Sequence, residues 1–313
     1  MRDITKPAGA PPLSGVLLNE RRSPTIRRRR LGAELRRRRE AARVTIETVA
    51  DRLECSASKI SRIETGHTTA TPRDVRDMLE IYGVVGAEAD ELVQISREAR
   101  QKGWWHPYSA VLTGAYVGLE AAAQSVRAYE QQVVAGLLQN EEYAKAMIRA
   151  ARPDIGAEEV ERRVRVRLGR QTLLTQGDPI DLWVVLDEAV VSRPVGGDAV
   201  MRAQLERLVA AADAPNVTLQ VLPFEAGAHA GMDGTFAILS FPEPGDPDVV
   251  FAENATGGLF LEKSDELRKY VFIFDHIRAA ALRPEDSVAL LAKLAEEPLW
   301  KARSSEAALH SPA

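Results

Sequence analysis

The chain contains little cysteine, few aromatic residues and no long apolar run. Cys55 is the single cysteine among 313 residues, so no disulfide can form within the chain and a cytoplasmic setting is expected. No apolar run reaches the roughly 18–20 residues that cross a bilayer, and the N-terminal residues lack the apolar core of a secretory signal. We therefore expect no membrane contact.

Sequence patterns of catalysis and cofactor binding are also missing. No spacing of Cys and His suits zinc, and neither GxGxxG nor GxxxxGK(S/T) occurs. Asp187 and Glu188 are adjacent at the end of an expected strand, so they point to opposite faces and cannot act together as acid and base. His229 and Asp233 share the loop GAHAGMDG, but no nucleophile lies at a recognisable spacing from them. The sequence thus predicts no enzymatic activity, no cofactor and no metal.

Charge is distributed unevenly along the chain. The net charge is −4, yet residues 21–101 contain 18 Lys and Arg against 13 Asp and Glu. Eleven arginines lie between Arg21 and Arg43, where only Glu34 and Glu40 are acidic. The remainder of the chain is therefore acidic. A basic first third on an acidic body predicts contact with nucleic acid at one end only.

Composition and periodicity divide the chain into four parts. Residues 1–24 and 301–313 are expected to be disordered tails. Residues 25–101 show the periodicity and capping signals of five helices, and residues 102–300 form a second domain. The segment KGWWHP, residues 102–107, breaks the helical pattern and marks the junction.

The stretch TIETVADRLECSASKISRIETG, residues 45–66, predicts two short helices joined by a tight turn. Val49 and Ala50 give the first helix an apolar face, and Ile60 and Ile63 do the same for the second. Small Ala50 lets the helices cross closely, while polar side chains remain outside. This is the pattern of a helix-turn-helix, whose second helix enters the major groove of DNA.

In the second domain, helical periodicity gives way to alternation. Helices are expected between 118 and 150, and over 157–176, 198–212, 264–282 and 284–296. Strands are expected over 180–191, 217–224, 234–241, 248–254 and 259–262, with the last three antiparallel. The fold class is therefore α+β: an all-α five-helix unit followed by a mixed sheet domain flanked by helices.

Residues 31–83 resemble the N-terminal module of Xre/lambda-repressor-like helix-turn-helix regulators, on the motif LRRRREAARVTIETVADRLECSASKISRIETG. The resemblance implies a double-stranded DNA operator as partner and a recognition helix that starts at Ser56. Arg62 on that helix suits a bidentate contact to guanine. The implied DNA-binding residues are Arg36, Arg39, Thr45, Ser56, Ala57, Ser58, Lys59, Ser61, Arg62 and His67.

The same resemblance implies a structural ion pair and shows three departures. Arg39 and Glu64 occupy positions that form an ion pair in that family, so we expect the pair here. Ile46 stands where the family often has a polar residue that contacts phosphate, which puts that contact in doubt. Arg43 and Glu54 stand where glycine is usual and the chain turns left-handed.

Segments of the second domain resemble the sensor-like domain of actinobacterial WhiJ-type regulators. They are YEQQVVAGLLQNEEYAKA, LDEAVVSRPVGG, VLPFEAG and Leu259–Glu262, and the resemblance covers residues 104–297. It implies that the domain responds to a small molecule or to a small protein encoded nearby. The ligand- or partner-binding residues that we expect are Trp104, Trp105, Trp183, Glu188 and His229. Packing of the tryptophans and a structural turn at Glu188 are the alternative interpretations.

These features predict a sequence-specific DNA-binding transcription regulator, cytoplasmic and associated with the nucleoid. Because one helix-turn-helix reads few base pairs, we expect a homodimer held by the second domain. Two alternatives stay open: an antitoxin-like autorepressor that neutralises a neighbour-encoded partner, and a hydrolase tethered to DNA. A short adjacent reading frame would favour the first alternative.

Overall fold

The computed structural model describes residues 24–100, 114–175, 177–243, 246–254, 257–298 and 300. The expected tails lie outside these residues apart from Pro24, and so does the expected junction at 102–107. Among the described helices, none combines the length and apolar character that crossing a membrane requires.

Residues 24–100 form five helices, as the sequence predicts. They are α1 (Pro24–Ala41), α2 (Ile46–Arg52), α3 (Ala57–Glu64), α4 (Pro72–Tyr82) and α5 (Ala87–Ala99). Thr45, Ser56 and Thr71 each accept a backbone N–H of the following first turn, which fixes where α2, α3 and α4 begin. The apolar faces meet in one core, which includes Leu31, Leu35, Val49, Ala50, Ile60, Ile63, Val75, Met78 and Leu92.

Two turns of this unit are left-handed without glycine. Arg43 and Glu54 have φ angles of 57° and 51°, which confirms the turns expected at these positions. A left-handed conformation costs a non-glycine residue about 1–2 kcal/mol. Backbone hydrogen bonds before and after Glu54 hold the second turn in place. The N–H of Leu53 donates to the carbonyl of Val49 at 3.0 Å, and the N–H of Cys55 donates to that of Ala50 at 2.9 Å.

Gly32 allows α1 to approach the end of α3. A Cβ added at Gly32 would lie 2.5 Å from the carbonyl oxygen of Ile63 and 2.7 Å from that of Glu64. Glycine inside a helix is about 1 kcal/mol less favourable than alanine. The residue is therefore explained by the close contact of two backbones and not by helix propensity.

The second unit contains one sheet with helices on both faces. Its strands are β1 (Ser125–Glu130), β2 (Asp181–Asp187), β3 (Val217–Leu222), β4 (Phe236–Ser240), β5 (Val249–Asn254) and β6 (Gly257–Leu261). Its helices are α6 (Gly114–Glu120), α7 (Glu141–Ala151), α8 (Ala157–Arg170), α9 (Glu188–Ser192), α10 (Asp198–Ala211), α11 (Ser264–Ala280) and α12 (Pro284–Glu296). Short 3₁₀ turns occupy Gly136–Leu138, Gln171–Leu174 and Phe224–Ala226.

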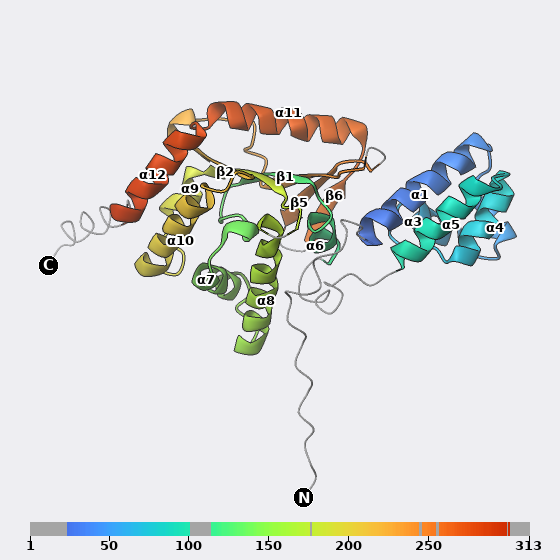
Figure 1. Ribbon diagram of the computed structural model, residues 1–313, viewed down its shortest axis with the longest axis horizontal. Coiled ribbons are helices and arrows are strands. Elements are labelled where there is room, and N and C mark those ends of the chain that lie inside the picture. Colours follow the sequence, from blue (N-terminus) through green and yellow to red (C-terminus); the bar gives the residue numbers. More distant parts are fainter. Residues whose placement is uncertain are drawn as a thin grey trace, which may run out of the picture.

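The six strands follow the order β3-β2-β1-β4-β5-β6. Neighbours among β1, β2 and β3 are parallel, whereas β4, β5 and β6 pair antiparallel. Figure 1 shows α11 across one face of the sheet and α7, α8, α10 and α12 on the other. The α+β class and the antiparallel order of the last three strands are both confirmed.

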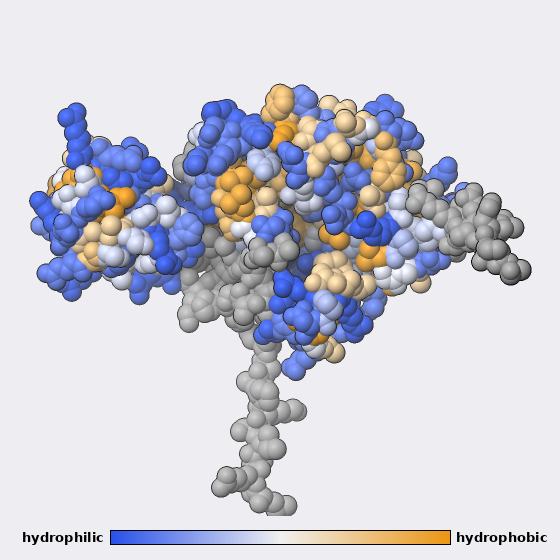
Figure 2. Space-filling view, turned by 180° about the vertical axis from the view of Figure 1, so that it is seen from behind, coloured by the Kyte–Doolittle hydropathy of each residue, from blue (hydrophilic) through white to orange (hydrophobic). Residues whose placement is uncertain are grey.

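Alternate residues of the strands supply two cores. Val126 and Ala128 belong to the larger core beneath the α10 side, and Tyr129 belongs to the smaller core with Phe274 of α11. The outer edge of β3 is covered by the turn between α11 and α12 and by the first turn of α12. The N–H of Leu282 in that turn donates to the carbonyl of Val221 at 2.9 Å, and Ser287 Oγ of α12 accepts the N–H of Val221 at 2.9 Å. Hydrophilic side chains cover most of the face visible in Figure 2, with separate apolar patches on the larger unit.

The structure corrects two sequence expectations. The stretch 118–150 was expected to be helical, but it contains the central strand β1, which pairs with β2 and β4. The strand expected over 180–191 ends at Asp187, where the side chain accepts the N–H of Ala189 and starts α9. Both errors concern segments whose short length and mixed composition suit a helix or a strand equally.

Replacing Gly32 by alanine should destabilise the first unit, whereas helix propensity alone predicts that it is stabilised. Propensity alone would stabilise the unit by about 1 kcal/mol. We expect destabilisation by about 1–3 kcal/mol, because the added methyl group overpacks the contact with α3. Urea unfolding followed by circular dichroism measures this change, and a stabilised Gly32→Ala protein would show that the backbones are not in close contact.

Candidate functional site

The recognition helix α3 separates an apolar from a polar face. Ile60 and Ile63 are buried in the core of the first unit, whereas Ser58 and Arg62 are exposed. Both exposed residues were predicted to contact DNA. A guanidinium and a hydroxyl on one exposed helix face can donate to base edges and phosphates.

The other predicted residues of this region have structural partners. Ser56 caps α3 by accepting the N–H of Lys59 at 3.2 Å, and Thr45 caps α2 in the same manner. Lys59 Nζ donates to Asp74 of α4 at 3.1 Å.

Three further predicted residues lie on or just after α3. Ala57 packs against the core. Ser61 is partly exposed, and its carbonyl accepts the hydroxyl of Thr65. His67 is exposed, and its Nδ1 lies 2.9 Å from Thr65 Oγ1.

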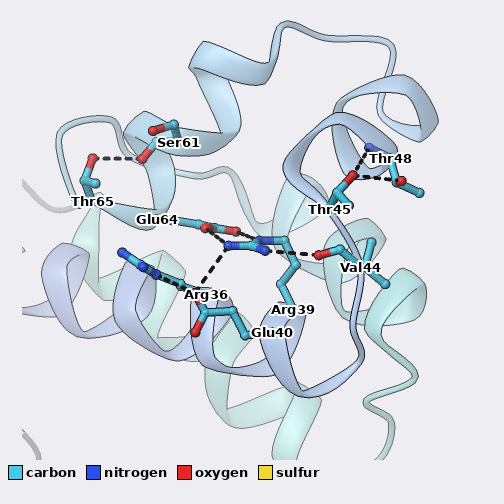
Figure 3. A network of polar contacts seen from close by, with 9 residues as sticks. All are labelled: Arg36, Arg39, Glu40, Val44, Thr45, Thr48, Ser61, Glu64 and Thr65. Atoms are coloured by element: carbon cyan, nitrogen blue, oxygen red, sulfur yellow. Dashed lines mark hydrogen bonds and ion pairs between the residues drawn. The ribbon is translucent and has the colours of Figure 1, made fainter.

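The expected ion pair between Arg39 and Glu64 is confirmed (Figure 3). Arg39 Nε and Nη2 donate to the two carboxylate oxygens at 2.7 and 2.9 Å. Its Nη1 donates to the carbonyl of Val44 at 3.0 Å, and the hydrogen bonds to Glu64 raise the pKa of Arg39. The side chains of Arg39 and Glu64 are only 10% and 3% exposed. Arg39 therefore joins α1 to α3 through a buried side chain, and its predicted contact with DNA stays a prediction.

Most arginines of α1 have intramolecular partners. Arg27 pairs with Glu98, and Arg38 pairs with both Glu34 and Glu88. Arg36, a predicted DNA contact, pairs with Glu40, but its side chain remains 58% exposed. Exposed ion pairs of this kind contribute about 0–1 kcal/mol to stability. Arg36 can therefore exchange Glu40 for a phosphate at little cost.

The start of α1 connects the two units. Ile26 is buried in the larger core of the second unit. Arg29 pairs with Glu262 at 2.8 Å, and its guanidinium lies 5.1 Å from the ring centroid of Phe260 on β6. Arg28 Nε donates to the carbonyl of Gly66, just after α3, at 2.6 Å. The helix that supports the recognition helix thus also contacts the sheet domain.

A polar cluster lies where β1 and β2 end, on the α11 face. Tyr129 Oη donates to Asp187 Oδ2 at 3.3 Å and lies 3.5 Å from His229 Nε2. The N–H of Gly231 donates to His229 Nδ1 at 3.1 Å, so the neutral imidazole carries its proton on Nε2. Burial raises the pKa of Tyr129 to about 12. Sequence reasoning found His229 but paired it with Asp233, whereas the structure brings it to Tyr129 and Asp187.

The remaining predicted residues of the second unit do not join this cluster. Glu188 Oε2 accepts the N–H of Phe224 at 2.8 Å, which matches the structural interpretation of this residue. Trp183 Nε1 donates to Gln220 at 2.8 Å, and its ring packs against Phe274 and Arg278 of α11. Trp104 and Trp105 lie outside the described residues.

A second group of charged side chains, which sequence reasoning missed, lies on the opposite face of the sheet. Arg170 of α8 binds Glu120 of α6 through two hydrogen bonds of 2.6 Å, and both side chains are buried. Glu130 at the end of β1 and Arg167 of α8 complete the group. Burial and the charge of Glu253 raise the pKa of Glu130 to about 8, despite the opposing charge of Arg167.

This architecture defines a helix-turn-helix protein with an appended α+β domain. Residues 30–92 match the family described as helix-turn-helix domain, which indicates a DNA-binding regulator. Residues 113–293, more than half of the chain, match the family described as domain of unknown function (DUF5753), and the chain belongs to that family. No curated protein and no solved structure matches the chain.

Removing the carboxylate of the buried ion pair should weaken the first unit. We expect Glu64→Ala to lower the free energy of unfolding by about 3–5 kcal/mol, because Arg39 keeps a buried charge without its partner. The double variant Arg39→Met/Glu64→Leu is the control and should lie within about 1 kcal/mol of the parent protein. An unchanged melting temperature in Glu64→Ala would contradict the role of the pair.

The raised pKa of Glu130 makes stability depend on pH. The folded protein binds the proton more tightly than the unfolded chain, so stability falls as pH rises from about 4.5 towards 8. Glu130→Gln removes this loss. We expect the variant to match the parent at pH 4 and to exceed it by roughly 1–3 kcal/mol at pH 8, after allowance for solvent screening. Urea titrations at both pH values test the prediction, and equal unfolding free energies at pH 8 would refute it.

Proposed function

We propose that this protein is a sequence-specific, homodimeric transcription regulator whose second domain receives a signal. The observation that carries the proposal is the exposed pair Ser58 and Arg62 on α3, held outward by the buried Ile60 and Ile63. The exposed Arg36 supplies a further positive charge beside the motif. In this proposal the second domain is of the WhiJ type, binds its effector without chemical turnover, and places two recognition helices on a two-fold operator.

The contacts of α1 support a route from signal to DNA. Arg29 binds Glu262 and Phe260 in the sheet domain, and Arg28 binds the carbonyl of Gly66 immediately after α3. A Cβ added at Gly66 would lie 2.9 Å from Arg29 Cγ, so this loop rests directly on α1. In the proposal, a shift of β6 relative to α1 changes how α3 is presented to DNA.

The test begins with an operator selected by the full-length protein from random-sequence DNA. We expect an inverted repeat, because a two-fold protein dimer binds two related half-sites. Arg62→Ala should weaken binding to it about tenfold or more and relax the preference at one base pair in each half-site. Measurements at several salt concentrations separate base recognition from phosphate contact.

Arg97→Ala is the matched control for this experiment, because Arg97 is also exposed but lies on α5. It should bind the selected operator with unchanged affinity. Equal effects of the two substitutions would show that α3 does not read the operator. Selection of a single half-site, together with a monomer in analytical ultracentrifugation, would count against the dimer.

A further inference from the structure

Among the described helices, α11 alone lies across its face of the sheet (Figure 1). Phe274 and Ile277 of this helix are buried in the core beneath it. The exposed residues on its opposite side recur every three or four positions and therefore form one stripe. This α11 stripe includes Asp265, Arg268, Lys269, Phe272, Asp275 and His276.

An aromatic ring lies at the centre of the α11 stripe. Phe272 is 61% exposed, and its ring stacks on that of His276 with 3.9 Å between the centroids. Figure 2 shows apolar side chains among hydrophilic ones along the top of the larger unit, where α11 lies. An exposed ring of this size favours a partner, because contact with one removes its apolar surface from water.

Two further exposed apolar side chains lie on the same side of the sheet. Met232 follows Gly231, where an added Cβ would lie 2.7 Å from Ile277 Cδ1 of α11. Leu259 is exposed on β6, on the same strand face as Leu261, which packs into the core beneath α11. Exposed apolar surface that extends over neighbouring elements is typical of a protein interface.

The charges of the α11 stripe cancel each other. Asp265 and Asp275 balance Arg268 and Lys269, whereas the sheet domain as a whole is acidic. In the part of the chain that the structure describes, neither Arg268 nor Lys269 forms an ion pair. Asp275 pairs with Arg278 at 3.4 Å, but both side chains are largely exposed and exchange partners readily. A neutral stripe is the place where two acidic domains approach with the least repulsion.

We propose that two copies of this chain dimerise through the α11 stripe, with the two helices antiparallel about a two-fold axis beside Phe272. Such a contact uses the same surface on both copies, so Phe272 packs against Phe272 of the second copy. Arg268 and Asp275 lie on one flank of the stripe, four residues before and three residues after Phe272. In antiparallel helices, residues on the same flank meet across the pair. Arg268 of each copy therefore meets Asp275 of the other.

The opposite flank is complementary as well. It carries Lys269 and His276, which meet across the pair in the same way. His276 Nδ1 donates to the carbonyl of Phe272 at 2.8 Å, so the neutral imidazole leaves Nε2 as an acceptor. The ammonium group of Lys269 can donate to this nitrogen of the second copy. The match on both flanks favours a second copy over a protein of different sequence, for which no such symmetry is needed.

The dimer deepens the proposed function, on which this step rests, by placing the two DNA-binding units. Glu262, which binds Arg29 of α1, lies two residues before α11 begins, and the DNA-binding unit extends beyond this end of α11 (Figure 1). An antiparallel pair puts these ends on opposite sides, separated by the length of a 17-residue helix, about 25 Å. Two units that extend outward from there can reach half-sites about 34 Å apart, one turn of DNA.

Sedimentation equilibrium of the full-length protein tests the surface. We expect the parent to dimerise at micromolar concentration. Phe272→Glu should weaken association about thirtyfold or more, because the ring is central to the pair, while the circular dichroism spectrum stays unchanged. Val85→Glu is the matched control, since Val85 is also exposed but lies between α4 and α5, and it should dimerise like the parent. A monomeric parent, or a Phe272→Glu protein that dimerises like the parent, overturns the proposal.

A charge exchange tests the antiparallel pairing itself. Arg268→Glu and Asp275→Arg should each weaken their own dimers about tenfold or more, because each puts like charges across the pair. In an equal mixture, the two variants should associate within about threefold of the parent affinity, since every facing pair is then of opposite charge. A mixture that associates no better than either variant alone overturns the pairing.

The interface and the regulator proposal fail separately. Operator selection is carried out with the parent and with Phe272→Glu. If Phe272→Glu is monomeric but no operator can be selected with the parent, the regulator proposal fails and the interface stands. If the parent binds an operator and Phe272→Glu remains a dimer, the interface fails and the regulator proposal stands.

Discussion

The structure depends on one helix, α1, that belongs to two hydrophobic cores at once. Leu31 and Leu35 are buried in the core of the helix-turn-helix unit, while Ile26 is buried in that of the sheet domain. A helix is stiff over this length, because its residues are tied by successive backbone hydrogen bonds. In the proposed regulator, a displacement of the sheet domain against Ile26 and Arg29 reaches Gly32, where the backbones of α1 and α3 lie in close contact. This contact has no room for a side chain at position 32.

The helix-turn-helix unit could be predicted from the sequence because its signals are local. Caps at Thr45, Ser56 and Thr71 lie within three residues of the N–H groups that they accept. The central strand β1 (SVRAYE) could not be predicted, since the residues on either side of it are good helix formers. Only its pairing with β2 and β4 makes this segment a strand. The cluster of Tyr129, Asp187 and His229 unites residues up to 100 positions apart. Arg170 has the spacing of an ordinary surface arginine, so only the fold reveals its buried pair with Glu120.

Buried arginines fix the relative orientation of helices in this protein more than they add to its stability. Replacing a buried ion pair by apolar residues is often neutral or stabilising, yet a fork of two hydrogen bonds admits one orientation of the carboxylate. Arg39 fixes the crossing of α1 and α3 in this way, and Arg170 fixes α8 against α6. The first pair also supports α3, the helix that we assign to DNA recognition. Rigid supports of this kind reduce the entropy that binding would otherwise cost.

The anchoring of α1 also bears on how such proteins can diversify. The matched helix-turn-helix region begins at residue 30, so Ile26, Arg28 and Arg29 lie just before it. A DNA-binding unit exchanged at that boundary would lack Arg29, the side chain that packs over Phe260 and pairs with Glu262. The two units are therefore not freely interchangeable modules. Recombination that preserves function would have to move the first turn of α1 together with β6, even though the two are separated by more than half of the chain.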